Sequence, residues 1–190
     1  DYSGKFIMKN PMQIKKDLIS SKSIKRPIQF IGFDDEVLKV KELIVNIYLL
    51  HPDYRVLILA RKNRNIKELF NDEDFIDNVG TKVTLAGFED IKIDAMSIHK
   101  SKGLTYDEVI IMGLDRDFPI GSRSNFWLED LFKPENDEEK FAYAEERRVF
   151  YVGLTRTKNH VYLLVNQDAS LRSPFIDEMY QIIKKENNKF

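Results

Sequence analysis

Short apolar runs alternating with helical patterns are the feature of this 190-residue sequence that most restricts its fold. RVLILA (55–60), EVIIM (108–112) and HVYLLV (160–165) are unbroken apolar runs of strand length. Such runs are typical of strands buried on both faces of a parallel sheet, because a strand with one solvated face alternates apolar and polar residues. The sequence therefore predicts a sheet whose central strands are covered on both sides.

Further segments complete the pattern. Additional strands are predicted for residues 28–33, 82–85 and 91–98, and helices for 36–50, 65–70, 141–157 and 174–183. Asp34 and Asp35 suit the N-cap of the first helix, and Gly153 inside a helical pattern suggests close packing. Residues 113–137 are rich in turn formers and predict a long loop. Alternating strands and helices indicate an α/β fold with a largely parallel sheet flanked by helices.

Charge gives little guidance to function. The chain has 30 Lys and Arg against 31 Asp and Glu, a net charge of −1, so it lacks the global basic character of many nucleic-acid-binding domains. Residues 5–26 are mainly basic and residues 129–146 mainly acidic. Both runs are interpreted first as solvated surface, and a phosphate-binding face is the alternative for the basic run.

The sequence contains no cysteine, which excludes disulfides and thiolate metal sites and is consistent with a reducing cytoplasm. Its three histidines are far apart in the sequence, so no histidine-based zinc site is expected. The longest apolar stretch, residues 43–50, is far too short to span a membrane. Because the sequence starts at Asp1, we expect a domain or processed fragment of a longer chain, 190 residues being enough for one domain.

Three polar segments follow or flank the predicted strands. Arg61 comes directly after the strand at 55–60, where a ligand-facing loop is expected, and its guanidinium suits phosphate. SIHKSKG (97–103) combines hydroxyls, an imidazole, lysines and a turn glycine, which suit a phosphodiester backbone. EERRVFYVGLTRTK (145–158) ends in Arg156. Taken singly, the three segments are explained equally well, in the same order, as a residue in a surface salt bridge, a polar loop and an amphipathic helix with charged ends.

Taken together and in this order, VLILAR, MSIHKSKGL and EERRVFYVGLTRTK resemble motifs four, five and six of UvrD/Rep-like superfamily-one DNA helicases. YDEVIIMGLDRDFP and KNPMQIKKDL also fit that family, and the short spacing between the first two motifs is similar to the helicase IV-like branch. The resemblance implies a second, RecA-like motor domain of the P-loop NTPase fold. No GxxxxGK[ST] phosphate loop occurs, so the domain would lack a phosphate loop of its own.

The resemblance also implies roles for single residues. Arg61 would reach the γ-phosphate of ATP, and Arg156 would be the arginine finger that stabilises the transferring phosphoryl group. Gly103 would allow a turn beside the nucleotide, and Glu146 and Arg148 would support the motif around Arg156. The residues implied to contact DNA are Ser97, His99, Lys100 and Lys102. Thr105 stands where many relatives have a glutamate that meets the ribose of ATP.

The implied organisation is a lead-in segment (1–27), a core (28–168) and a C-terminal helix (169–190) of one motor domain. Its partners would be single-stranded or duplex DNA and the first RecA-like domain of the same full-length chain, which would hold the phosphate loop and Mg²⁺. Alone, the fragment is expected to be inactive, cytoplasmic and free of membrane. The alternatives are the motor of an AddA- or RecB-type helicase–nuclease and a non-catalytic scaffold that binds DNA or protein.

Overall fold

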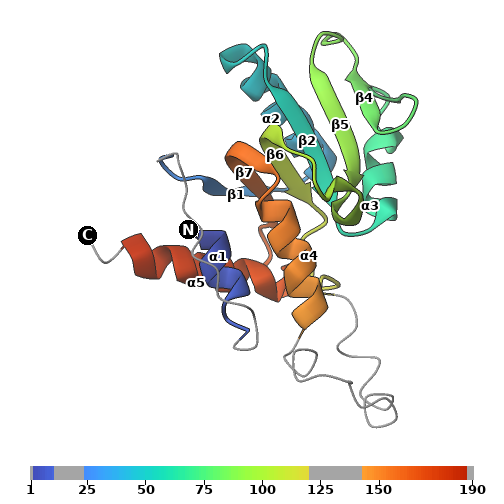
Figure 1. Cartoon of the computed structure of the whole chain (residues 1–190). Helices are drawn as coiled ribbons and strands as arrows, with labels where there is room; N and C mark the ends of the chain where they lie inside the picture. Colours follow the sequence, from blue (N-terminus) through green and yellow to red (C-terminus); the bar gives the residue numbers. More distant parts are fainter. Residues whose placement is uncertain (1, 11–23, 120–142, 188–190) are drawn as a thin grey trace.

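The structure is a computed structural model that describes residues 2–10, 24–119 and 143–187. Its centre is a seven-stranded sheet with the order β1-β7-β6-β2-β5-β4-β3 (Figure 1). The strands are β1 (Ile28–Phe33), β2 (Arg55–Ala60), β3 (Phe75–Asp77), β4 (Lys82–Leu85), β5 (Lys92–Ser97), β6 (Tyr106–Met112) and β7 (Thr157–Asn166).

Five of the seven strands are parallel. β1, β7, β6, β2 and β5 pair in parallel, and only β4 and β3 are added in antiparallel orientation at one edge. Val56–Ala60 of β2 and Val109–Met112 of β6 are completely or almost completely buried, as expected for strands covered on both faces. The predicted α/β fold with a largely parallel sheet flanked by helices is confirmed.

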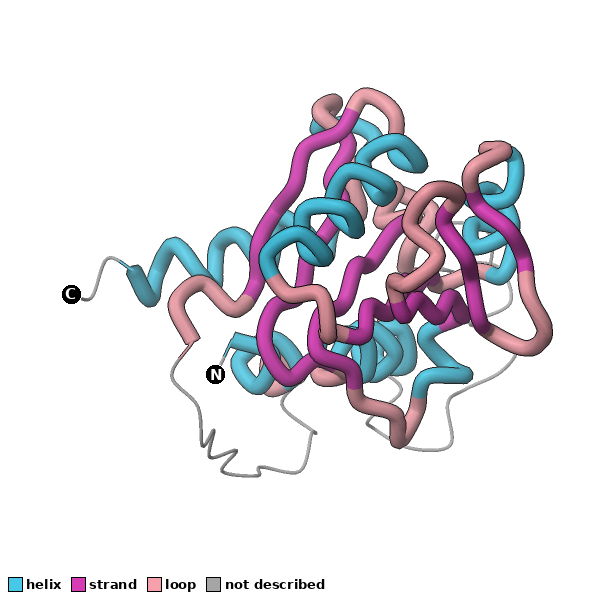
Figure 2. The backbone as a smooth tube through the Cα atoms, turned by 90° about the horizontal axis from the view of Figure 1, so that it is seen from above, coloured by secondary structure: helices cyan, strands magenta, loops and turns pink. Residues whose placement is uncertain are grey.

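Helices cover both faces of the sheet (Figure 2). They are α1 (Tyr2–Ile7), α2 (Glu36–Leu50), α3 (Asn63–Glu68), α4 (Ala144–Leu154) and α5 (Pro174–Asn187), with short 3-10 turns η1 (Leu69–Asn71), η2 (Ile98–Ser101) and η3 (Ala169–Leu171). α2 and α3 pack with Ile58 and Ile110 on one face, and α1, α4 and α5 pack with Leu57 and Leu59 on the other. Successive residues of β2 thus enter two separate hydrophobic clusters.

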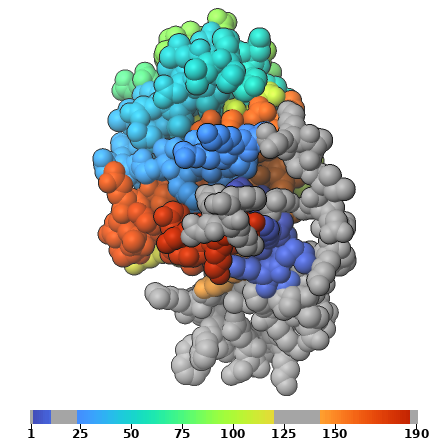
Figure 3. Space-filling view, turned by 90° about the vertical axis from the view of Figure 1, so that its left-hand side faces the viewer, coloured from blue at the N-terminus to red at the C-terminus, as the bar shows by residue number. Residues whose placement is uncertain are grey.

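The N-terminal segment packs into the second of these clusters. Phe6 of α1 is fully buried, and its ring meets the rings of Phe150 in α4 and Phe175 in α5 at centroid distances of 5.3 and 5.2 Å. The guanidinium of Arg147 lies over the rings of both Phe6 and Phe175 and forms two hydrogen bonds with Glu178. α1 and α5 therefore lie side by side (Figure 3), and α1 also packs against α4.

Most predicted elements are found, but α1 and the short 3-10 turns were not predicted, and there are further differences. The predicted helix 141–157 is described from Ala144 and ends at Leu154, because Thr157 already begins β7. The strand β3 was not predicted, and the helix predicted for 65–70 divides into α3 and η1. Asp35 is the N-cap of α2, as predicted, and accepts a hydrogen bond from the amide of Leu38 at 2.9 Å. Residues 120–137 of the predicted loop lie outside the described residues.

Candidate functional site

The segment 145–158 folds into α4 and the first residues of β7, and it brings Glu146 next to Arg61. Arg61 follows the last residue of β2, so it lies at the carboxyl end of that strand. Its guanidinium donates to both carboxylate oxygens of Glu146, from Nε at 2.8 Å and from Nη2 at 2.7 Å. The hydrogen bonds with Glu146 raise the pKa of Arg61, although partial burial opposes this. The pair joins the sheet to the first turn of α4.

Arg156 lies at the other end of α4 and has a different environment. Its guanidinium donates to the carbonyl oxygen of Val152 at 2.9 Å, to that of Leu104 at 3.1 Å and to the hydroxyl of Thr155 at 3.1 Å. All three acceptors are neutral, and partial burial lowers the pKa of Arg156. Because no carboxylate among the described residues pairs with it, this half-buried cation keeps an uncompensated charge that favours an anion.

The two arginines that were expected at one nucleotide have their partners at different turns of α4. Their partners on α4, Glu146 and the carbonyl of Val152, are six residues apart, which corresponds to a rise of about 9 Å. Arg148, the other residue expected to support the motif, pairs with Glu145 at 3.2 Å.

The segment 97–103 forms the end of β5, the turn η2 and the turn that leads to β6. His99, Lys100 and Lys102 are exposed, whereas Ser97 is only 7% exposed and faces the interior. Gly103 has a φ of +86°, a conformation that favours glycine, so its predicted role in a turn has a clear structural reason. The same turn carries Leu104, whose carbonyl holds Arg156, and therefore connects the exposed lysines with that arginine.

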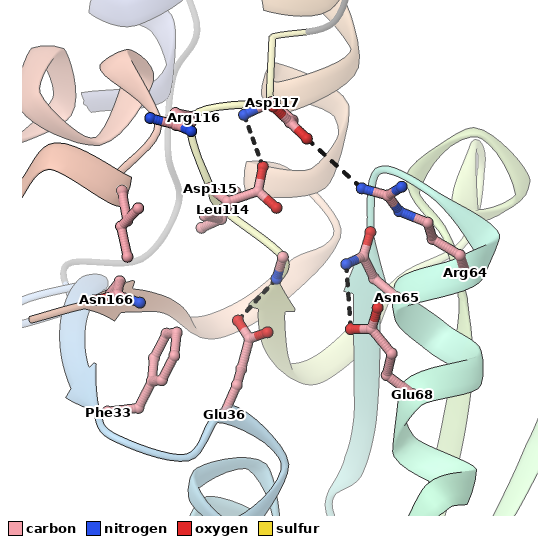
Figure 4. A pocket seen from close by; sticks show the side chains of 12 residues that line it. Phe33, Glu36, Arg64, Asn65, Glu68, Leu114, Asp115, Arg116, Asp117 and Asn166 are labelled. Carbon is pink, nitrogen blue, oxygen red and sulfur yellow. Dashed lines mark hydrogen bonds and ion pairs between the residues drawn. The ribbon is translucent and has the colours of Figure 1, made fainter. Parts of the chain in front are cut away.

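A pocket of about 390 Å³ that the sequence did not reveal opens at the carboxyl ends of β1, β7 and β6 (Figure 4). It adjoins the position where the connections from β6 and β2 leave in opposite directions, the usual place for ligands in such sheets. Gly113, with a φ of +66°, forms part of its wall, and a Cβ atom there would lie 2.9 Å from Cγ of Asn65. The carboxylates of Glu68, Asp115 and Asp117 and the guanidiniums of Arg64 and Arg116 surround it.

Glu36 is the most perturbed carboxyl group of this pocket. It accepts a hydrogen bond from the amide of Gly113 at 2.8 Å. Burial raises its pKa to about 7, and the nearby carboxylates of Glu68 and Asp115 act in the same direction, against the effect of that hydrogen bond. Perturbed carboxyl groups in clefts often mark functional sites. The sequence signal was an acid in the first turn of a helix, which the favourable helix dipole explains equally well.

The described residues contain no group of three or more His, Asp and Glu side chains that is placed to hold a metal ion. No helix among them has the length and apolar character needed to cross a membrane. The guanidinium of Arg156, whose described partners are all neutral, instead favours an anion.

Comparison with known proteins identifies the family. Residues 71–168 match the UvrD-like helicase C-terminal domain. DNA helicase IV of Escherichia coli K12 is 32% identical over 181 residues, covering 93% of this chain and 24% of the relative. An ATP-dependent helicase/nuclease of Staphylococcus aureus JH9 is 30% identical over 140 residues, covering 58% of this chain and 12% of the relative.

Among solved structures, the C-terminal domain of a possible DNA helicase from Lactobacillus plantarum WCFS1 has a TM-score of 0.52 and 14% identity, and the match covers 92% of this chain and 88% of that one. At this identity the likeness supports the fold alone. The chain spans about a quarter of the length of DNA helicase IV. The family match extends from η1 through β7 and includes both the segment 97–103 and α4. The chain therefore belongs to the UvrD-like helicase C-terminal domain family.

Proposed function

We propose that this chain is the second motor domain of an ATP-dependent DNA helicase and that it supplies Arg156 to an ATP bound against a first motor domain. The observation that carries the proposal is the environment of Arg156, a half-buried guanidinium held by three neutral oxygens. Phosphoryl transfer depends on positioning and on stabilisation of negative charge, and an arginine that meets the transferring group contributes roughly 10³ to 10⁵ in rate. Arg156 has the charge for this task and no carboxylate among the described residues to neutralise it.

Arg61 has a weaker claim to the same task. Its charge is already balanced by the two hydrogen bonds to Glu146, so a phosphate would have to displace that carboxylate. We therefore assign Arg61 and Glu146 to holding α4 against the sheet, and a direct contact of Arg61 with the γ-phosphate would require a rearrangement of this pair. Gly103 contributes by shaping the turn whose next residue, Leu104, holds Arg156.

Single-stranded DNA is proposed to contact the turn after β5. His99, Lys100 and Lys102 are exposed there and can bind phosphate oxygens. Ser97, being buried, would act by supporting the turn and not by touching DNA. Mg²⁺, the phosphate loop and the catalytic base are assigned to the first motor domain, so this chain alone is expected to hydrolyse no ATP.

A second candidate function has specific support. The relative from Staphylococcus aureus that is named an ATP-dependent helicase/nuclease shares 30% identity over 140 residues, so the same domain also suits a motor that is linked to a nuclease. Both functions use the same ATP site, and the test of Arg156 applies to both. A non-catalytic scaffold is less favoured, because a scaffold has no use for a half-buried arginine whose described partners are all neutral.

The experiment is a DNA-stimulated ATPase assay on the full-length protein with the variant Arg156→Ala. The expected result is a loss of about 10³-fold or more in kcat with little change in the melting temperature. Lys67→Ala, which removes one exposed positive charge from α3, is the matched control and should retain activity. A variant Arg156→Ala that hydrolyses ATP at the wild-type rate would remove Arg156 from the reaction. A wild-type protein that binds DNA without hydrolysing ATP would favour the scaffold.

A further inference from the structure

The hydroxyl group of Thr155 lies between the last turn of α4 and the guanidinium of Arg156. Its Oγ1 is 3.1 Å from Nη2 of Arg156, 3.0 Å from the carbonyl oxygen of Tyr151 and 3.1 Å from that of Val152. The amide of Thr155 also donates to these two carbonyls, at 3.1 and 3.2 Å. Backbone and side chain of Thr155 are thus both fixed to the end of the helix.

The chemistry of the three groups sets the direction of each hydrogen bond. A guanidinium can only donate, so Oγ1 of Thr155 must accept from Arg156. The two carbonyls can only accept, so the single hydroxyl proton of Thr155 goes to Tyr151 or Val152. Because the hydroxyl is anchored to the helix through its proton, its lone pair points at Arg156 from a fixed position.

Thr155 differs from the other two acceptors of Arg156 in one respect. The oxygens of Val152 and Leu104 belong to the main chain and are present whatever the side chains at those positions. Among the described contacts of this guanidinium, Oγ1 of Thr155 is the acceptor that a side chain provides. Residue 155 is therefore the position at which a substitution can change the orientation of Arg156 without altering Arg156 itself.

Two donors of Arg156 remain available to a ligand. A guanidinium has five N–H groups, and three are used by Val152, Leu104 and Thr155. One N–H on each terminal nitrogen remains without a partner among the described residues. A guanidinium that keeps free N–H groups on both terminal nitrogens can donate to phosphate oxygens. The neutral hydroxyl of Thr155 holds the guanidinium without neutralising its charge.

We propose that Thr155 is a positioning residue that holds the guanidinium of Arg156 in the orientation required for phosphoryl transfer. The proposal rests on the proposed function of Arg156. An arginine side chain has many rotamers, so a guanidinium that loses one of its three acceptors spends more of its time in unproductive orientations. Groups that act on a transition state must be held to within about 0.5 Å, which a hydroxyl anchored to the helix can provide.

The test is steady-state ATP hydrolysis by the full-length protein with saturating single-stranded DNA. Thr155→Val keeps the shape of the side chain and removes the acceptor, whereas Thr155→Ser keeps the hydroxyl. Thr155→Val is expected to lower kcat about tenfold with the KM for ATP changed less than about twofold, because the lost interaction belongs to the transition state. Thr155→Ser is expected to stay within about twofold of the wild type. Thr155→Ala, which also lacks the acceptor, should repeat the result of Thr155→Val.

A double-mutant cycle separates positioning from a general structural effect. If Thr155 acts through Arg156, adding Thr155→Val to Arg156→Ala causes no further loss of kcat. The proposal is overturned if Thr155→Val and Thr155→Ala both hydrolyse ATP at the wild-type rate. It is also overturned if Thr155→Val lowers kcat by the same factor with and without Arg156. Full activity of Arg156→Ala alone would instead refute the proposed function on which the inference rests.

Discussion

The ion pair between Arg61 and Glu146 connects two segments that the sequence separates by 85 positions. The side chains are 20% and 9% exposed, so solvent screens the pair only weakly. Glu146→Gln is expected to lower the free energy of unfolding by about 3 kcal/mol, because it leaves the guanidinium of Arg61 partly buried without its counter-charge. Urea denaturation of the chain measures this.

A double-mutant cycle with Arg61→Gln should give a coupling energy above about 1 kcal/mol for this pair. Glu145→Gln is the control, since the pair between Glu145 and Arg148 is exposed and should contribute less than about 1 kcal/mol. Equal losses from Glu145→Gln and Glu146→Gln would contradict the importance assigned to the buried pair.

Glu36 makes the stability of the fold depend on pH. Burial raises its pKa from 4.5 to about 7 in the folded chain, so the folded state binds the proton more tightly than the unfolded state. The contribution of Glu36 is therefore complete below about pH 4.5 and is lost as the pH rises through 7. Glu36→Gln has no charge to lose and can still accept from the amide of Gly113. Its stability relative to the wild type should rise by about 2 kcal/mol between pH 5 and pH 8. If the stabilities of the wild type and of Glu36→Gln change with pH in parallel, this prediction is wrong.

At the scale of single elements, α4 packs so closely on the sheet that only glycine fits without adjustment at position 153. A Cβ atom on Gly153 would lie 3.1 Å from Cδ1 of Ile111. Alanine favours a helix over glycine by about 1 kcal/mol, and the crowded contact opposes that gain. Ile111→Val removes the crowding atom. Gly153→Ala should thus be more favourable by about 1 kcal/mol in the Ile111→Val background than in the wild type, as thermal unfolding of the four proteins would reveal. If the effects of Gly153→Ala and Ile111→Val on stability are additive, the contact between position 153 and Ile111 does not oppose the alanine.

The secondary-structure elements show which parts of the fold can be predicted from sequence patterns. β2, β6 and β7 were predicted because an apolar run buried on both faces leaves a local signal. β3 has three residues, of which only Phe75 is buried, and it is held by pairing with β4, so its cause is not local. Arg147 could not be distinguished from Arg148 by sequence, yet it is 4% exposed and lies among Phe6, Phe175 and Glu178. The partners of a side chain are decided by the tertiary fold.

The candidate site was predicted only in part, because motifs are local whereas the contacts between side chains depend on the tertiary fold. The motifs identified the segments, and the predicted fold correctly put Arg61 at the end of a strand. The pairing of Arg61 with Glu146 and the pocket at Gly113 were not predicted, because each depends on segments that meet only in the folded chain.

For the whole molecule, the turn after β5 should add to DNA affinity mainly through charge. Replacing both Lys100 and Lys102 with alanine in the full-length protein is expected to weaken binding of a single-stranded oligonucleotide several-fold. It should also reduce the slope of log affinity against log salt concentration by about 0.7 for each phosphate that is no longer neutralised. Fluorescence anisotropy at several salt concentrations measures both quantities, with Lys67→Ala as the control. An unchanged slope would show that neither lysine meets phosphate.

The attachments of α4 have a mechanical consequence. The helix is tied to the sheet through Arg61, to α5 through the pair of Arg147 and Glu178, and to the turn before β6 through Arg156. Because α4 is attached at three points along its length, a displacement of one end is passed on to the elements that it contacts. A pull at the guanidinium of Arg156 would therefore reach the sheet and α5 as well as the turn before β6.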